Sequence, residues 1–233
     1  MEFTHDVRCA QTAFASLCPM GGSFIFIRVA VPILGPIVTA EVRVLIAGLT
    51  LLLYATAISA QLELRSRWFQ YLLIGALNSA IPFALISTAE MHLTASIAAI
   101  LNATTPLFGA VISTLWLKDP LTGRKIVGIA ISIIGVIILV GWSPLIRNYV
   151  TFVSIGASLL ASALYGLASV YTKAKTTDAP PLGMAVGSQL GASLLLIPAL
   201  PFVPPMSWPS PMVMLCVLTL ALLSTALGSV LKL

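Results

Sequence analysis

The chain has 233 residues, of which 59% are hydrophobic and only 8% are charged, and its mean hydropathy is +1.06. Soluble domains carry about 25% charged residues, so this composition excludes a soluble protein and indicates an integral membrane protein. The formal net charge of +5 requires no nucleic-acid partner, because basic side chains at a membrane surface can meet anionic lipids. The expected surroundings are therefore a lipid bilayer.

The stretches between charged residues have the length of membrane-spanning helices. A bilayer core requires roughly 20 apolar residues of helix, and continuous runs such as IVGIAISIIGVIILVGW exclude the alternating pattern of an outer-membrane barrel. In chain order, the uncharged stretches are 9–27, 44–62, 68–89, 93–117, 126–146 and 148–172. A last tract, 179–231, is long enough for two helices, which its central prolines separate. The sequence therefore predicts an all-α polytopic membrane protein with about eight transmembrane helices.

The basic residues predict the orientation of these helices. Arg28 and Arg147 fall on the side of the membrane opposite the amino terminus, and Arg43 lies inside a span. The basic residues on the same side as the amino terminus are Arg8, Arg65, Arg67, Lys118, Arg124, Lys125, Lys173, Lys175 and Lys232. By the positive-inside rule that side is the cytoplasm, so both ends of the chain are expected to be cytoplasmic.

An internal repeat emerges when the chain is shifted by 145 residues. The shift places Gly21 on Gly166, Arg28 on Lys173, Pro36 on Pro181 and Ser79 on Ser224. An odd number of spans separates corresponding positions, so the two copies must be inverted. Inverted repeats are typical of secondary transporters, which bind substrate near the midplane and rock around it. The predicted domains are a first repeat of five helices, 1–145, and an incomplete second repeat of three helices, 146–233.

Five stretches together resemble the EamA family of the drug/metabolite transporter superfamily. They are MGGSFIFIRVAVPILGP, AEVRVLIAGLTLLL, ALNSAIPFAL, ASIAAILNATTPLFGAVISTLWLKDPLTGRKIVGIAISIIGVIILVG and ALYGLASVYTK. Proteins of this family are ten-helix carriers with two repeats that export amino acids and other small metabolites, usually from the bacterial cytoplasm. The resemblance implies an exporter in the bacterial inner membrane that works by alternating access around a mid-membrane cavity.

The chain departs from the family pattern in three places. The first helix has MGGS where the family usually shows Trp-Gly-Ser, and Asp119 stands where Glu is usual. The second repeat has no counterpart of residues 89–145, which form about two helices. The alternative to a working carrier is therefore a truncated, transport-inactive fragment. We expect the chain to be less stable than a ten-helix version and to transport little unless a homodimer fills the gap.

The fourth expected helix carries the strongest candidate for a substrate site. Pro106 cannot donate to the carbonyl of Asn102, and an unpartnered polar group in hydrocarbon is costly. We therefore expect this helix to face a cavity, where Asn102, Thr104 and Thr105 offer neutral donors and acceptors to a small-molecule substrate. The kink at Pro106 would serve as a gating hinge. The alternative role is structural: threonine side chains satisfy the freed carbonyl, and Asn102 ties two helices together.

Other polar residues within the spans are weaker candidates for the same site. Arg43 matches the arginine that the resemblance places in the second helix, where it either steers substrate or coupling ions or fixes helix packing. Asn78 and Ser79 lie in a second polar kink of the third span. Tyr165 and Gln189 add polar groups to the second repeat.

Three further residues are expected to lie near water, and one helix is expected to pack closely. Glu41 lies near the external end of the second span and should face water, and Glu90 and His92 should lie in an external link. The glycines of GMAVGSQLG recur every four residues, which predicts a small-residue stripe for close helix packing.

No catalytic, metal or cofactor site is expected. Intramembrane enzymes need a nucleophile with its base, paired acids or a metal cluster, whereas the two histidines lie far apart and neither HExxH nor GxSxG occurs. The cysteines, Cys9, Cys18 and Cys216, lack metal-ligand spacing. No filter motif of a channel is visible either. The sequence thus favours a carrier of small neutral or zwitterionic metabolites.

Overall fold

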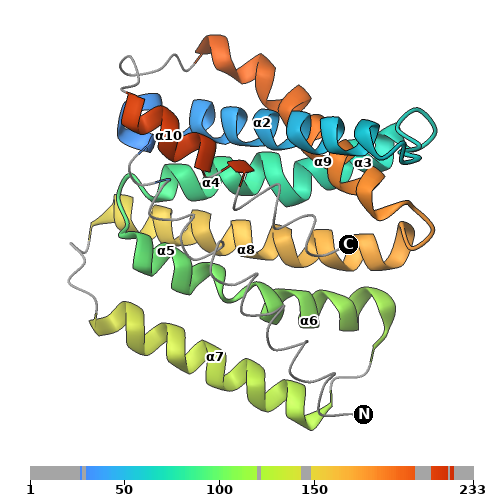
Figure 1. Cartoon of the computed structure of the whole chain (residues 1–233). Helices are drawn as coiled ribbons and strands as arrows, with labels where there is room; N and C mark the ends of the chain where they lie inside the picture. Colours follow the sequence, from blue (N-terminus) through green and yellow to red (C-terminus); the bar gives the residue numbers. More distant parts are fainter. Residues whose placement is uncertain are drawn as a thin grey trace, which may run out of the picture.

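The computed structural model describes residues 27, 30–119, 122–142, 148–202, 211–219 and 221–222. Every regular element within these residues is helical (Figure 1). The elements are α2 (Pro36–Ala57), α3 (Trp68–Gly75), the π-helical turn η1 (Ala76–Ala80), α4 (Ile81–Ala89), α5 (Ala95–Asn102), α6 (Thr105–Leu117), α7 (Gly123–Trp142), α8 (Tyr149–Lys175), α9 (Pro181–Leu196), the 3₁₀ turn η2 (Ile197–Phe202) and α10 (Pro211–Thr219). The predicted all-α class is confirmed.

Five helical segments within the described residues are long and apolar enough to cross a membrane. They are Pro36–Ala57, Trp68–Ala89, Ala95–Leu117, Tyr149–Lys175 and Pro181–Phe202. A shorter apolar segment, Ile126–Ile138, lies within α7. The chain is therefore a polytopic membrane protein, as predicted. The expected first span, 9–27, lies outside the described residues except for residue 27.

The second span begins earlier than the charge pattern predicts. The uncharged stretch begins at residue 44, whereas α2 begins at Pro36 and contains both Glu41 and Arg43. Their exposed fractions are 3% and 8%, so neither side chain marks the membrane surface. The expectation that Glu41 faces water is wrong, because it is buried within the bundle. Glu90 lies in the link between α4 and α5 but is buried, whereas His92 in the same link is exposed.

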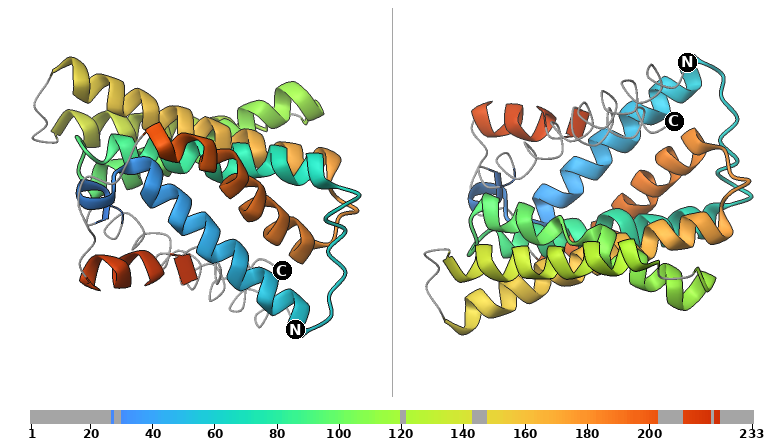
Figure 2. Two further views of the ribbon diagram at one scale, coloured as in Figure 1. Left: turned by 90° about the horizontal axis from the view of Figure 1, so that it is seen from above. Right: turned by 90° about the horizontal axis from the view of Figure 1, so that it is seen from below.

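The helices pack side by side in a layered bundle, with α8 near its centre (Figure 1). One side of α8 packs against α4, and α5 and α6 pack along another. Helix α9 crosses both α2 and α3, and Figure 2 shows α2 and α9 at an angle to the α8 layer. Helix α7 lies at the outer flank, next to α5 and α6.

The glycine stripe of α9 packs closely against α3, as predicted. A Cβ atom built on Gly187 would lie 2.6 Å from Cγ of Tyr71, and one built on Gly191 would lie 3.1 Å from Cα of Leu72. Tyr71 is 2% exposed, and its hydroxyl donates to the carbonyl of Leu62 at 3.1 Å. Glycine is required here because a larger residue has no room between the two helices.

The third span is interrupted where its polar kink is predicted. The π-helical turn η1 covers Ala76–Ala80 and lies between α3 and α4. Pro82, in the first turn of α4, has no N–H with which to continue the helical hydrogen-bond ladder. The wider π turn accommodates this break, and such turns occur frequently at functional sites.

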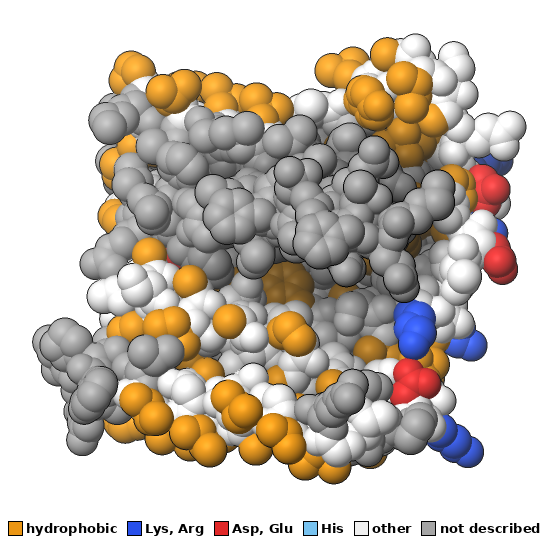
Figure 3. Space-filling model, turned by 60° about the horizontal axis from the view of Figure 1, so that its bottom comes forward, with side chains coloured by type: hydrophobic (Ala, Val, Ile, Leu, Met, Phe, Trp, Pro, Cys, Tyr) orange, Lys and Arg blue, Asp and Glu red, His pale blue; other side chains and the backbone are white. Residues whose placement is uncertain are grey.

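Charged side chains gather along the right edge of the face shown in Figure 3, and hydrophobic side chains lie toward its upper and lower margins. Two ion pairs lie at span ends: Arg67 Nε lies 2.6 Å from Glu63 Oε2, and Lys173 Nζ lies 3.2 Å from Asp119 Oδ2. The hydroxyl of Ser113 also donates to Asp119 at 2.8 Å. In a membrane-spanning bundle, charged side chains are expected at the ends of the helices and apolar side chains along their sides.

Candidate functional site

The fourth span is broken near its middle. Helix α5 ends at Asn102 and α6 begins at Thr105, with Ala103 and Thr104 between them. Pro106 occupies the first turn of α6, where its missing N–H leaves no gap in that helix. The predicted break at Pro106 is thus confirmed.

The threonines satisfy the backbone carbonyls that the break releases. Thr105 Oγ1 donates to the carbonyl of Asn102 at 2.8 Å, and Thr104 Oγ1 donates to the carbonyl of Leu101 at 2.6 Å. The same carbonyl also accepts hydrogen bonds from the Thr104 N–H at 3.1 Å and from the Ser162 hydroxyl of α8 at 3.0 Å. The structural role considered for the threonines is therefore present. Their hydroxyl protons are engaged, although each oxygen can still accept a hydrogen bond from a ligand.

The side chain of Asn102 differs from its neighbours in having an unused acceptor. Its Oδ1 atom is buried and has no hydrogen-bond partner among the described residues. Leaving a buried acceptor unsatisfied costs about 1–3 kcal/mol. The atom is therefore positioned to accept a hydrogen bond from water or from a ligand.

Arg43 and Tyr165 come from distant parts of the chain and lie together around Phe83. The guanidinium carbon of Arg43 is 3.9 Å from the centroid of the Phe83 ring, and that centroid is 6.3 Å from the centroid of Tyr165. The nearby carboxylate of Glu90, at the end of α4, is the negative charge that bears on Arg43. We call Arg43, Phe83 and Tyr165 the arginine–aromatic cluster. It places a buried cation over an aromatic face, which stabilises the charge within an apolar bundle.

Helix α8 contributes Tyr165 to the arginine–aromatic cluster and also packs against the broken helix. Tyr165 packs against the apolar cluster that contains Ala98 of α5. Ser162, three residues earlier on α8, makes the hydrogen bond to the end of α5. Helix α8 therefore contacts α5 through both Tyr165 and Ser162. Phe83 was not expected from sequence, because a phenylalanine in an apolar helix gives no distinguishing signal.

The remaining candidate residues lie on η1 and α9. Ser79 is fully buried and its Oγ atom has no hydrogen-bond partner among the described residues, whereas Asn78 is exposed. Gln189 is 5% exposed, and a Cβ atom built on Gly48 of α2 would lie 3.3 Å from its Cβ. Gln189 therefore belongs to the interface between α2 and α9.

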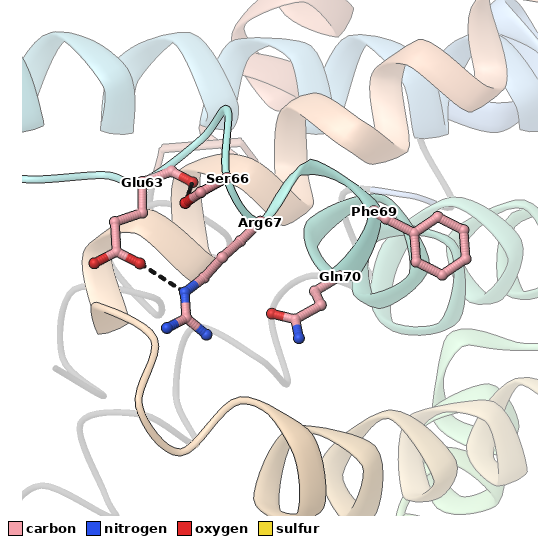
Figure 4. A pocket seen from close by; sticks show the side chains of 5 residues that line it. All are labelled: Glu63, Ser66, Arg67, Phe69 and Gln70. Carbon is pink, nitrogen blue, oxygen red and sulfur yellow. Dashed lines mark hydrogen bonds and ion pairs between the residues drawn. The ribbon is translucent and has the colours of Figure 1, made fainter.

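An open pocket near the start of α3 lies apart from these residues (Figure 4). It is lined by Glu63, Ser66, Arg67, Phe69 and Gln70. In Figure 4, Arg67 points toward Glu63, and this hydrogen bond raises the pKa of Arg67 above its ordinary value. An exposed ion pair of this kind is ordinary at a membrane surface, and we assign no substrate role to the pocket.

The chemistry of the candidate site is that of binding. Among the described residues, no group of three or more His, Cys, Asp or Glu side chains could hold a metal ion. The candidate residues offer the guanidinium of Arg43, the phenol of Tyr165 and the amide of Asn102. Thr104 and Thr105 add two hydroxyl oxygens.

The sequence of the chain matches a known protein family. The model of the EamA-like transporter family matches residues 8–141. The uncharacterized inner membrane transporter YedA of Escherichia coli K12 is 31% identical over 202 residues, which cover 84% of this chain and 63% of YedA. An uncharacterized transporter of Archaeoglobus fulgidus is 24% identical over 184 residues, which cover 78% of this chain and 63% of that protein. The chain thus spans less than two thirds of the length of these relatives.

A solved crystal structure of another protein shares the fold. The two structures superpose with a TM-score of 0.68 and 15% sequence identity, over 93% of this chain and 77% of the other. This likeness concerns the fold alone, whereas the family match covers more than half of the sequence. Because the family consists of transporters, the expectation that this protein is not an enzyme is also confirmed. The chain belongs to the EamA-like transporter family.

Proposed function

We propose that this protein carries small zwitterionic or neutral metabolites, such as amino acids, out of the bacterial cytoplasm by alternating access. The observation that carries this proposal is the broken helix α5–α6, which packs against α8, the helix that contributes Tyr165 to the arginine–aromatic cluster. Discontinuous helices near the midplane form the substrate sites of many secondary transporters. Arg43 would bind the carboxylate of the substrate, and Asn102 Oδ1 would accept a hydrogen bond from its donor group.

An inverted repeat supports the alternating-access mechanism. The spans Pro36–Ala57 and Pro181–Phe202 both have 22 residues. Adding 145 to the residue numbers of the first span gives both the first and the last residue number of the second. Each begins with a proline in its first turn. The two spans also pack against each other, through α2 and α9. Such paired, inverted segments can exchange conformations and so open the site to either side of the membrane.

Export requires a defined orientation, and we expect the amino terminus to be cytoplasmic. Green fluorescent protein fused after Leu64 or after Asp119 should fluoresce, because both links are rich in basic residues. Alkaline phosphatase inserted near His92 should be active, because that enzyme matures outside the cytoplasm. Fluorescence from green fluorescent protein fused at His92 would contradict the predicted orientation. Western blots of all fusions control for differences in expression.

The broken helix itself can be tested with Asn102→Leu. We expect efflux of a radiolabelled amino-acid mixture from proteoliposomes to fall about tenfold or more, because a hydrogen bond to substrate contributes about 0.5–1.5 kcal/mol and leucine also fills its place. Thr88→Val is the matched control. The Thr88 hydroxyl donates to a carbonyl of its own helix and is exposed.

The same experiment distinguishes a substrate contact from a helix tie. If Asn102 only ties two helices together, Asn102→Leu should lower the thermal stability in detergent while flux per folded protein stays unchanged. Flux is therefore normalised to the monodisperse fraction in size-exclusion chromatography. Unchanged normalised flux would reject Asn102 as a substrate contact.

A further inference from the structure

Glu41 is a carboxylate buried at the interface of α2 and α9. It lies in a membrane-spanning helix, and only 3% of the residue is exposed. Ser193 of α9 donates a hydrogen bond from its hydroxyl to Oε1 of Glu41 at 2.6 Å. The other oxygen, Oε2, is buried and has no hydrogen-bond partner among the described residues. One oxygen of the carboxylate is thus held by α9, and the part of the chain that the structure describes offers the other no donor.

The described elements packed against α2 provide no cation for this carboxylate. No Asp, Glu, Lys, Arg or His occurs in α4, α9, α10, η1 or η2, and Cys216 is the one titratable residue of α10. On α2 itself, Tyr54 lies more than three turns away, and Arg43 interacts with Phe83, Tyr165 and Glu90. An ionised Glu41 would therefore place a negative charge in apolar surroundings, which is unfavourable.

Gln189 adds a second buried acceptor to the same interface. It lies one helical turn before Ser193 on α9, and its Oε1 atom has no hydrogen-bond partner among the described residues. Both the Glu41 and the Gln189 side chains therefore present an acceptor to an interface that supplies too few donors. A proton on Glu41 would convert one acceptor into a donor and remove the buried charge at the same time.

We propose that Glu41 binds the proton that drives transport by this protein. The O–H bond forms when Oε2 takes a proton from water on one side of the membrane. It breaks when the proton returns to water on the other side and leaves the bonding electron pair on the carboxylate. Ser193 holds Oε1 through both states. Arg43 lies two residues along the same helix, so movement of α2 would link proton binding at Glu41 to substrate binding at Arg43.

This inference rests on the proposed transport function, but its first test does not. Infrared difference spectra of the full chain in lipid, recorded between about pH 5 and pH 9, should show the C=O band of a protonated carboxylic acid that disappears as the pH rises. The band should be absent from Glu41→Gln. It should persist in Glu63→Gln, because Glu63 is exposed and paired with Arg67.

Ser193→Ala tests the hydrogen bond that positions the carboxyl group. The band should remain but move to higher frequency, because the C=O group no longer accepts a hydrogen bond from the serine. This shift also shows that the band belongs to Glu41 in a folded protein. An unchanged frequency would contradict the assignment.

A flux measurement then connects the proton to transport. A proton gradient should accelerate efflux of the radiolabelled amino-acid mixture from wild-type proteoliposomes at least tenfold, and Glu41→Gln should abolish this acceleration. Absence of a Glu41-dependent band, a band that never titrates, or a band removed by NaCl but not by choline chloride would overturn the proton site. A titrating band without amino-acid flux would leave proton binding in place and contradict the proposed transport function.

Discussion

Replacing Gly187 by alanine should markedly destabilise the protein. The added Cβ atom would lie 2.6 Å from Cγ and 2.9 Å from Cβ of Tyr71, a side chain that is 2% exposed. The Tyr71 Cβ atom is fixed by the α3 backbone, so a change of side-chain rotamer cannot relieve that contact. Overpacking of this kind costs about 1–3 kcal/mol, and occasionally more. Thermal unfolding in detergent should show a lower midpoint for Gly187→Ala than for the wild type.

Gly156→Ala is the matched control for this prediction. Gly156 lies within α8, and nothing lies within 4 Å of a Cβ atom built there. Alanine is favoured over glycine in a helix by about 0.5–1 kcal/mol, so this variant should be as stable as the wild type or slightly more stable. Equal midpoints for the two alanine variants would contradict the close packing of α9 on Tyr71.

The parts of the fold that depend on local chemistry could be predicted from sequence. Pro106 lacks an N–H whatever its surroundings, so the break in the fourth span followed from the residue itself. The glycine stripe of α9 followed from a spacing that puts small residues on one face. The apolar stretches predicted which segments are helical because every backbone group in a bilayer must be paired within its own helix.

The parts that depend on contacts between distant residues could not be predicted. The burial of Glu41 depends on Ser193, which lies 152 residues away in the chain. Charged residues predict the membrane surface, so the charge pattern alone places the start of the second span at residue 44, later than the observed start of α2 at Pro36. Phe83 joins Arg43 to Tyr165 only when three helices are packed together, and no property of its own stretch singles it out. The candidate residues were thus found singly, but their arrangement required the structure.

Arg43→Gln should strongly weaken substrate binding. If Arg43 binds the carboxylate of a zwitterionic substrate, the variant loses a charge-assisted interaction of about 1.5–3 kcal/mol, which corresponds to roughly 10-fold to 150-fold weaker binding. The apparent KM for amino-acid efflux should rise by that factor. Arg43→Lys should lie between wild type and Arg43→Gln, because lysine keeps the charge but lacks the planar, two-pronged guanidinium group.

A purely structural arginine would give a different pattern of results. The cation over the Phe83 ring, 3.9 Å from its centroid, contributes about 2 kcal/mol or more when it is shielded from water. Arg43→Gln would then lower thermal stability, while KM measured on the folded fraction would stay the same. Arg65→Gln serves as the control, because Arg65 is exposed in the link before α3 and should change neither quantity. A raised KM in Arg43→Gln, with KM unchanged in Arg65→Gln, would therefore identify Arg43 as a substrate-binding residue and not only a packing residue.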